Sequence, residues 1–257
     1  MTIAAASART TATAATSTAT STATSTSTTG SAGPSIFRRA LGADFDRLHP
    51  ELQRRFGFSS QDGVACIGTG RMERIRQGAR WLAPLLRLGS RQNILFPEHG
   101  RDVPFTIANY AYRDGFGRET VTFVRTFQFT RPRRFDATMV AAPQPGTVVD
   151  FLGTHQHLAV DLRVRVTGRG GLVISSGEQR VSALPGSPRW PAVLTGRADL
   201  HEWFDEEAGR FRIQVRVVNP LVGLVMGYQG WFTAEYPLIG PEGIPNHVRP
   251  VRESVRT

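Results

Sequence analysis

The chain has 257 residues, a formal net charge of +10, one cysteine and no lysine, so all 31 basic side chains are arginine. This composition excludes a collagen, a disulfide scaffold, a membrane-spanning chain and a metal site built from cysteines alone. The basic balance permits anionic partners but does not bear on the fold.

Residues 1–35 consist almost wholly of Ala, Ser and Thr. Such a segment has too few large apolar side chains to stabilise an ordered structure. It also lacks the continuous apolar stretch of a secretory signal. We therefore expect a disordered tail over residues 1–35, one β-rich domain over residues 36–240, a flexible tail over residues 241–257, and a cytoplasmic location.

Three helices are expected early in the domain. Residues 36–41 end at a glycine, which is typical of a helix terminus. Apolar side chains recur at helical spacing over residues 45–56, where Pro50 breaks or restarts the helix. The third candidate covers residues 79–88.

Alternation of polar and apolar residues dominates the rest of the chain. It is clearest over residues 119–129, 157–166 and 210–217, and this period of two predicts antiparallel strands with one wet face. Further candidate strands cover residues 64–75, 103–113, 135–141, 147–152, 171–181, 193–204 and 221–233. About nine or ten strands must curl rather than stay flat. The expected fold is mainly β, a curved antiparallel sheet or closed barrel with a few short helices.

Four segments carry a family resemblance. They are residues 35–57 (SIFRRALGADFDRLHPELQRRFG), 68–75 (GTGRMERI), 81–86 (WLAPLL) and 220–231 (PLVGLVMGYQGW). The last contains a Pro-Leu-x-Gly…Tyr-x-Gly-Trp pattern. Together they resemble an uncharacterised bacterial domain of unknown function that is common in actinobacteria and bacilli. The resemblance implies one domain over nearly all of residues 35–233 and brings no catalytic residues with it.

The spacing of two histidines is compatible with a metal site. His155 and His157 could lie on one face of a strand, and His201 with Glu202 could add ligands. However, the histidines are in register with Asp161 on the polar side of the alternation. A solvated face is therefore favoured, and we expect neither a metal nor a cofactor.

Arg125 and Glu202 each interrupt an apolar register, which predicts that both side chains point inward. A buried charge is costly unless it is paired or lies in a wet cavity. Two interpretations stay open. The residues form structural ion pairs, in one version with each other, or they belong to a polar cluster that orients a ligand or moves a proton.

The closing strand, residues 221–232, is apolar on both faces and contains three glycines. Such glycines indicate either a tight bend or room for a ligand. On the ligand interpretation, Tyr228 joins Arg125 and Glu202 as a candidate catalytic residue. Candidate ligand contacts are Gln229, Trp231 and Asn109.

Arginines 131, 133 and 134 are flanked by Phe127, Phe129 and Phe135, a combination that could bind single-stranded nucleic acid. A turn with solvated arginines is favoured, because the phenylalanines keep the register of core residues. Nucleic acid is therefore disfavoured as a partner.

The function hypothesis is a cofactor-independent barrel that binds a small hydrophobic organic molecule, in one version an anionic one. Its chemistry would be that of a metal-free cyclase or isomerase in natural-product biosynthesis, which needs mainly a shaped cavity and one or two polar groups. The alternative is a non-catalytic carrier of small molecules or lipids. The sequence gives neither the ligand nor the oligomeric state.

Overall fold

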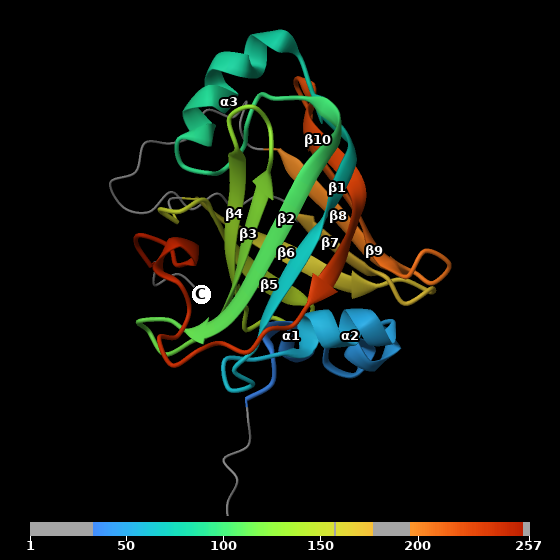
Figure 1. The fold of residues 1–257 in the computed structure, drawn as a ribbon, viewed down its shortest axis with the longest axis vertical. Coiled ribbons are helices and arrows are strands. Elements are labelled where there is room, and N and C mark those ends of the chain that lie inside the picture. Colours follow the sequence, from blue (N-terminus) through green and yellow to red (C-terminus); the bar gives the residue numbers. More distant parts are fainter. Residues whose placement is uncertain (1–32, 157, 177–195, 254–257) are drawn as a thin grey trace, which may run out of the picture. The chain divides into compact units, whose positions relative to one another are not determined.

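The structure is a computed structural model that describes residues 33–156, 158–176 and 196–253. In these residues ten strands form one closed antiparallel barrel in chain order, and β1 pairs with β10 to close it (Figure 1). The strands are β1 (Ala65–Gln77), β2 (Gly100–Arg113), β3 (Glu119–Phe127), β4 (Arg133–Ala141), β5 (Thr147–Leu152), β6 (Leu158–Val166), β7 (Leu172–Ser176), β8 (Arg197–Asp205), β9 (Arg210–Asn219) and β10 (Gly223–Glu235). The predicted fold class is confirmed.

Short helices accompany the barrel. They are α1 (Ile36–Leu41), η1 (Gly42–Arg47), α2 (Pro50–Gly57), η2 (Arg80–Leu82), α3 (Ala83–Ser90) and η4 (Asn246–Val248). The Ser35 hydroxyl caps α1 by accepting a hydrogen bond from the Arg38 amide, and Gly42 ends this helix with a φ of 55°. Pro50 starts α2, as its fixed φ favours. Of the described helices, none is long and apolar enough to cross a membrane.

Period-two alternation builds the barrel interior. In β9, Phe211, Ile213 and Val215 are buried, whereas Gln214 and Arg216 are exposed between them. Side chains of this inward set from all ten strands form one apolar core. The alternation that predicted the strands therefore also identifies which face of each strand is inside.

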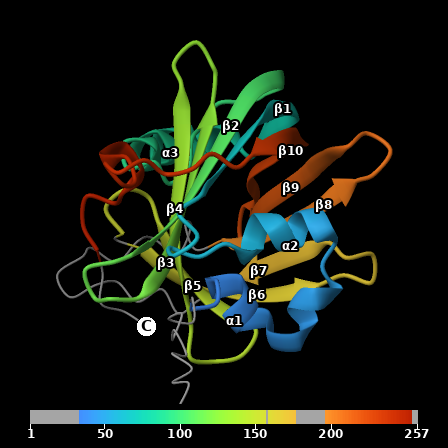
Figure 2. The same ribbon diagram turned by 60° about the horizontal axis from the view of Figure 1, so that its bottom comes forward.

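The helices lie at opposite ends of the barrel. Helices α1 and α2 cover one end, and α3 lies at the other end, where it contacts β4 (Figures 1 and 2). On α2, Leu52, Arg55 and Phe56 are buried. On α3, Leu86 and Gly89 are buried.

The segment after β10 differs from the expected flexible tail. Ile244 and Val248 are buried against Tyr112 and Val124 on the outer face of β2 and β3. The Glu253 carboxylate accepts a hydrogen bond from the Gly115 amide at 2.6 Å. Residues 241–253 therefore pack on the barrel, because the outer face of β2 and β3 is apolar at this place.

Candidate functional site: a cavity under helix α3

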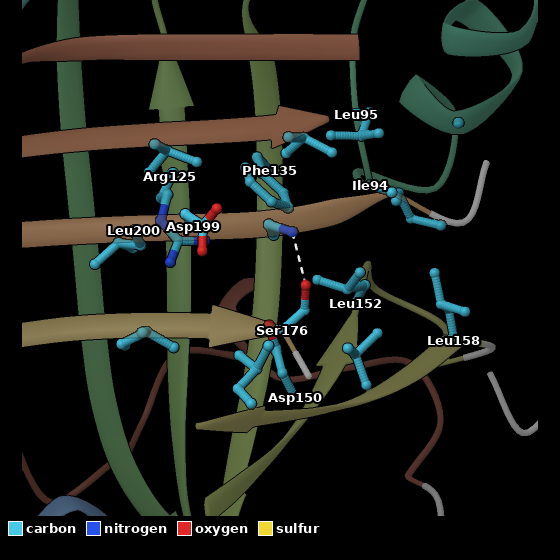
Figure 3. A pocket seen from close by; sticks show the side chains of 18 of the residues that line it. Ile94, Leu95, Arg125, Phe135, Asp150, Leu152, Leu158, Ser176, Asp199 and Leu200 are labelled. Atoms are coloured by element: carbon cyan, nitrogen blue, oxygen red, sulfur yellow. Dashed lines mark hydrogen bonds between the residues drawn. The ribbon is translucent and has the colours of Figure 1, made fainter. Parts of the chain in front are cut away.

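The barrel interior is hollow at the α3 end. The space open to the centre of a water-sized sphere is about 110 Å³ (Figure 3). Its apolar wall is formed by Leu85, Leu86, Ile94, Leu95, Phe135, Met139, Leu152, Leu158, Val160, Leu162, Ile174, Ala198, Leu200, Val215 and Val217. The polar residues that line it are Arg125, Asp150, Ser176, Asp199 and Tyr228. A mostly apolar cavity with a few polar groups is typical of a small-molecule site.

Arg125 faces this cavity from β3. It is 3% exposed, so the predicted inward orientation is confirmed. Its Nε is buried without an acceptor, and no carboxylate of the described residues lies within ion-pair distance of it. The guanidinium carbon lies 5.0 Å from the centre of the Phe135 ring and 5.3 Å from that of Phe123. Arg125 is thus a buried cation that packs against aromatic rings and forms no ion pair with the described residues.

Asp150 faces the same cavity from β5, flanked on its own strand by inward Val148 and Leu152. It is buried, and its Oδ1 receives no hydrogen bond from any part of the chain that the structure describes. Burial raises the pKa of Asp150 to about 7, and the charge of Arg125 opposes this rise. Near neutral pH this carboxyl group can therefore either accept or donate a proton.

Tyr228 completes the polar part of the wall from β10. Its ring packs edge-on against Phe127 at 5.1 Å, and its buried hydroxyl has no partner among the described residues. Burial raises the pKa of Tyr228 to about 12, partly opposed by Arg125. The hydroxyl therefore stays protonated at neutral pH and can donate a hydrogen bond into the cavity. Arg125, Asp150 and Tyr228 are called the cavity group below.

Glu202 is buried as predicted, but its ion-pair partner is Arg55 of α2 rather than Arg125. The Nη1 of Arg55 also donates to Cys66 Sγ at 3.0 Å and to Asn109 Oδ1 at 2.9 Å. The suggested pairing of Arg125 with Glu202 is therefore wrong. Sequence periodicity could not anticipate a partner on a helix 147 residues away.

Arg55, Cys66, Asn109 and Glu202, called the Arg55 cluster below, do not line the cavity. The Asn109 amide donates to the Thr122 carbonyl at 3.1 Å, so both ends of this side chain are engaged. Two residues proposed for the site, Glu202 and Asn109, thus belong to a hydrogen-bonded structural cluster.

Gln229 and Trp231, the other candidate ligand contacts, lie on the outer face of β10. Gln229 is exposed, and Trp231 packs under the Arg210 guanidinium at 4.5 Å. Between them, a Cβ on Gly230 would lie 2.2 Å from the Arg71 carbonyl oxygen. This glycine serves the close approach of β1 to β10, which favours the structural interpretation of the closing strand.

The structure describes two of the three histidines of the metal hypothesis. His155 precedes β6, His157 lies outside the described residues, and His201 stacks on Trp203 at 4.6 Å. The described residues contain no group of three or more His, Cys, Asp or Glu side chains that could hold a metal ion.

The arginines around residue 132 have protein partners. Arg133 donates to Glu98 at 2.7 Å and Arg134 to Asp136 at 2.7 Å. These ion pairs neutralise two of the three positive charges that would otherwise be available to bind a nucleic acid.

Sequence reasoning missed two residues, Asp150 and Arg55. Asp150 is the single charged residue of β5, and it shares its inward register with Val148 and Leu152. Arg55 follows Leu52 by three positions, which places it on the apolar face of α2.

Comparison with known proteins places the chain in a family. Residues 48–232 match the model described as "Domain of unknown function (DUF4166)". The chain belongs to this family. It is 32% identical over 202 residues to the uncharacterized protein YndH of Bacillus subtilis (strain 168), an alignment that covers 78% of this chain and 97% of that protein. No solved structure was found to match. The predicted resemblance to a bacterial domain of unknown function is confirmed, and both polar groups of the barrel lie in the matched region.

Proposed function

We propose that the barrel binds a small, mostly hydrophobic organic molecule with an acidic group in the cavity under α3. One observation carries the proposal. Arg125 and Asp150 are buried on the wall of the same apolar cavity, and the Nε of Arg125 and the Oδ1 of Asp150 have no hydrogen-bond partner among the described residues. A desolvated cation without an anion is costly in a folded protein. A bound anion would offset that cost, and the apolar wall would bury the rest of the molecule.

The cavity group also has the parts of a proton-transfer site. The Asp150 carboxylate can take a proton from a substrate carbon and return it at another position. Arg125 would stabilise the negative charge on the substrate between the two transfers, and the Tyr228 hydroxyl would donate a hydrogen bond to the same charge. Such a reaction is an isomerisation without a redox partner. The cyclase or isomerase of the sequence hypothesis belongs to this class.

The binding part of the proposal can be tested with a matched pair of probes. Octanoate and octanol have the same chain length and differ in charge. Titration calorimetry should show octanoate binding at least tenfold more tightly than octanol. In Arg125→Met this preference should vanish while octanol binds as before. Equal affinity of the wild-type protein for both probes would contradict the proposed role of Arg125.

The chemical part needs the natural ligand. Native mass spectrometry of the protein from its own host would detect a small molecule that co-purifies. Incubated in D₂O with catalytic amounts of protein, this molecule should gain deuterium with the wild type and not with Asp150→Asn. Binding without deuterium uptake by the wild type would favour the carrier alternative.

A further inference from the structure

A second feature lies outside the cavity, on the surface at the α3 end. An open groove of about 490 Å³ is lined by four arginines, Arg74, Arg76, Arg80 and Arg101, together with His99. The side chains come from the end of β1, from η2 and from the start of β2. All four arginines are exposed. These residues are called the basic groove below.

Nearby acidic side chains do not neutralise the basic groove, because other arginines bind them. Glu73 pairs with Arg212 at 2.8 Å, and Asp102 pairs with Arg71 at 2.8 Å. The four groove arginines have no carboxylate within ion-pair distance in the described parts of the chain. The pKa of Arg74 lies below its ordinary value, mainly because of the neighbouring charge of Arg76. The groove is therefore a concentrated positive surface.

Exposed apolar side chains occur at the same end of the barrel. Trp81 follows Arg80 directly and is 61% exposed, Leu88 of α3 is 53% exposed, and Leu221 in the turn before β10 is 78% exposed. Single exposed apolar side chains are common on protein surfaces, but several of them beside a basic surface are typical of a site that meets a membrane or a partner. Figure 1 shows α3, the end of β1 and the start of β10 at the same end of the barrel, so the elements that carry these side chains and the basic groove share this end.

We propose that the basic groove and Trp81, Leu88 and Leu221 dock the α3 end of the protein on an anionic lipid surface. Arginines attract anionic headgroups, and tryptophan with leucine enters the boundary between headgroups and acyl chains. A nucleic acid would use the charge but would gain nothing from Leu88 and Leu221. The inference does not depend on a ligand in the cavity. It would nevertheless place α3, whose Leu85 and Leu86 line that cavity, next to a hydrophobic phase.

Sedimentation with lipid vesicles tests the docking. The full chain should sediment with phosphatidylglycerol vesicles at low salt and not with phosphatidylcholine vesicles. Each basic residue near an anionic membrane contributes about 1 kcal/mol. The double variant Arg74→Gln with Arg101→Gln should therefore weaken vesicle binding about 30-fold. Should this variant fail to fold, Arg76→Gln with Arg80→Gln makes the same measurement.

A matched control has the same net charge. Arg163 and Arg165 are exposed on the outer face of β6, so the double variant of both to Gln removes two charges elsewhere. This control should bind vesicles like the wild type. Tryptophan fluorescence should shift to the blue on binding, and Trp81→Phe should abolish that shift.

Three outcomes would overturn the inference. One is no sedimentation with phosphatidylglycerol vesicles. Another is an equal loss in both double variants, which would mean that only net charge matters. The third is binding of a DNA oligonucleotide that depends on Arg74 and Arg101 while vesicles stay unbound.

Discussion

Two polar groups lie inside the same barrel, and they differ in how their charges are satisfied. In the Arg55 cluster, Arg55 donates to Glu202, Cys66 and Asn109. In the cavity group, the Nε of Arg125, the Oδ1 of Asp150 and the hydroxyl of Tyr228 lack partners among the described residues. Both groups are buried, so burial alone does not distinguish a structural cluster from a candidate site. The satisfaction of hydrogen bonds does.

The Arg55 cluster joins helix α2 to the barrel. Its one unpartnered donor, Nη2 of Arg55, belongs to a guanidinium whose carbon lies 4.8 Å from the centre of the Phe232 ring. Burial raises the pKa of Glu202, and the Arg55 charge opposes that rise. A buried ion pair of this kind contributes little to the stability of the folded protein when it is intact, but removing one partner is strongly destabilising. Its role is therefore to fix α2 over one end of the barrel.

The largest expected effect comes from breaking the Arg55 cluster. Arg55→Met leaves the Glu202 carboxylate buried and unpaired, which should lower the free energy of unfolding by about 3–5 kcal/mol. Adding Glu202→Gln should recover much of this loss, because no charge is then stranded. Urea unfolding of both variants measures this. The exposed pair of Arg47 with Asp44, at 2.9 Å, is the control, and Arg47→Met should cost less than about 1 kcal/mol. A single variant as stable as the wild type would contradict the structural role.

Asp150→Asn should raise the free energy of unfolding at neutral and higher pH, whereas Arg55→Met lowers it. Because the folded pKa of about 7 lies above the ordinary value of 3.8, the folded state binds more protons than the unfolded state between these values. Wild-type stability should therefore fall as the pH rises from about 4 to 7, and Asp150→Asn should remove this fall. At pH 8 the variant should be more stable by at most about 4 kcal/mol. At pH 4 the two proteins should be alike.

Thermal melts at both pH values check the Asp150 prediction. Asp46→Asn, at an exposed carboxyl, serves as the control and should change little at either pH. A lower melting temperature of Asp150→Asn at pH 8 would mean that the carboxylate has a stabilising partner after all.

Arg125→Met should separate stability from binding. The guanidinium forms no ion pair in the described structure, so its removal breaks no hydrogen-bonded pair. Its charge lowers the pKa of Asp150, and in the variant this carboxyl group can take up a proton instead of remaining as a buried charge. The melting temperature should stay within a few degrees of the wild type, equivalent to about 1 kcal/mol for a chain of this size. The preference for octanoate over octanol should nevertheless be lost. A melting temperature as low as that of Arg55→Met would mean that Arg125 has a structural role like that of Arg55.

Tyr228→Phe should give the smallest effect on stability. The hydroxyl has no partner, so its removal should change the free energy of unfolding by less than about 0.5 kcal/mol. Loss of one hydrogen bond to a bound acid should weaken octanoate about two- to tenfold. Calorimetry on the variant measures this, and unchanged affinity would remove Tyr228 from the site.

The sequence predicted the barrel and half of the relevant charges for one physical reason. Strands with one wet face show a period of two, and a charged residue in the apolar register stands out, as Arg125 and Glu202 do. Asp150 was harder to see because both faces of β5 are covered. Val149 and Phe151 on its outer face form a second buried cluster, so β5 shows no polar alternation against which a carboxylate contrasts.

The pairing of Glu202 could not be predicted at all. Arg55 stands next to Arg54, which resembles a solvated pair on a helix, and only the docking of α2 on the barrel end brings it to β8. The expected contacts Gln229 and Trp231 failed to reach the cavity for a simpler reason. They alternate with Tyr228 on a closed barrel, so at most one of the two registers faces inward.

The titration of the Asp150 carboxyl by carbon NMR tests the central claim most directly. If this carboxyl group is buried without a hydrogen-bond partner and is affected by the charge of Arg125, the midpoint of its titration in the wild-type protein should lie near pH 7. This midpoint should rise further in Arg125→Met. A midpoint near the ordinary value of 3.8, or one that Arg125→Met leaves unchanged, would contradict the assignment of Arg125 and Asp150 to one site.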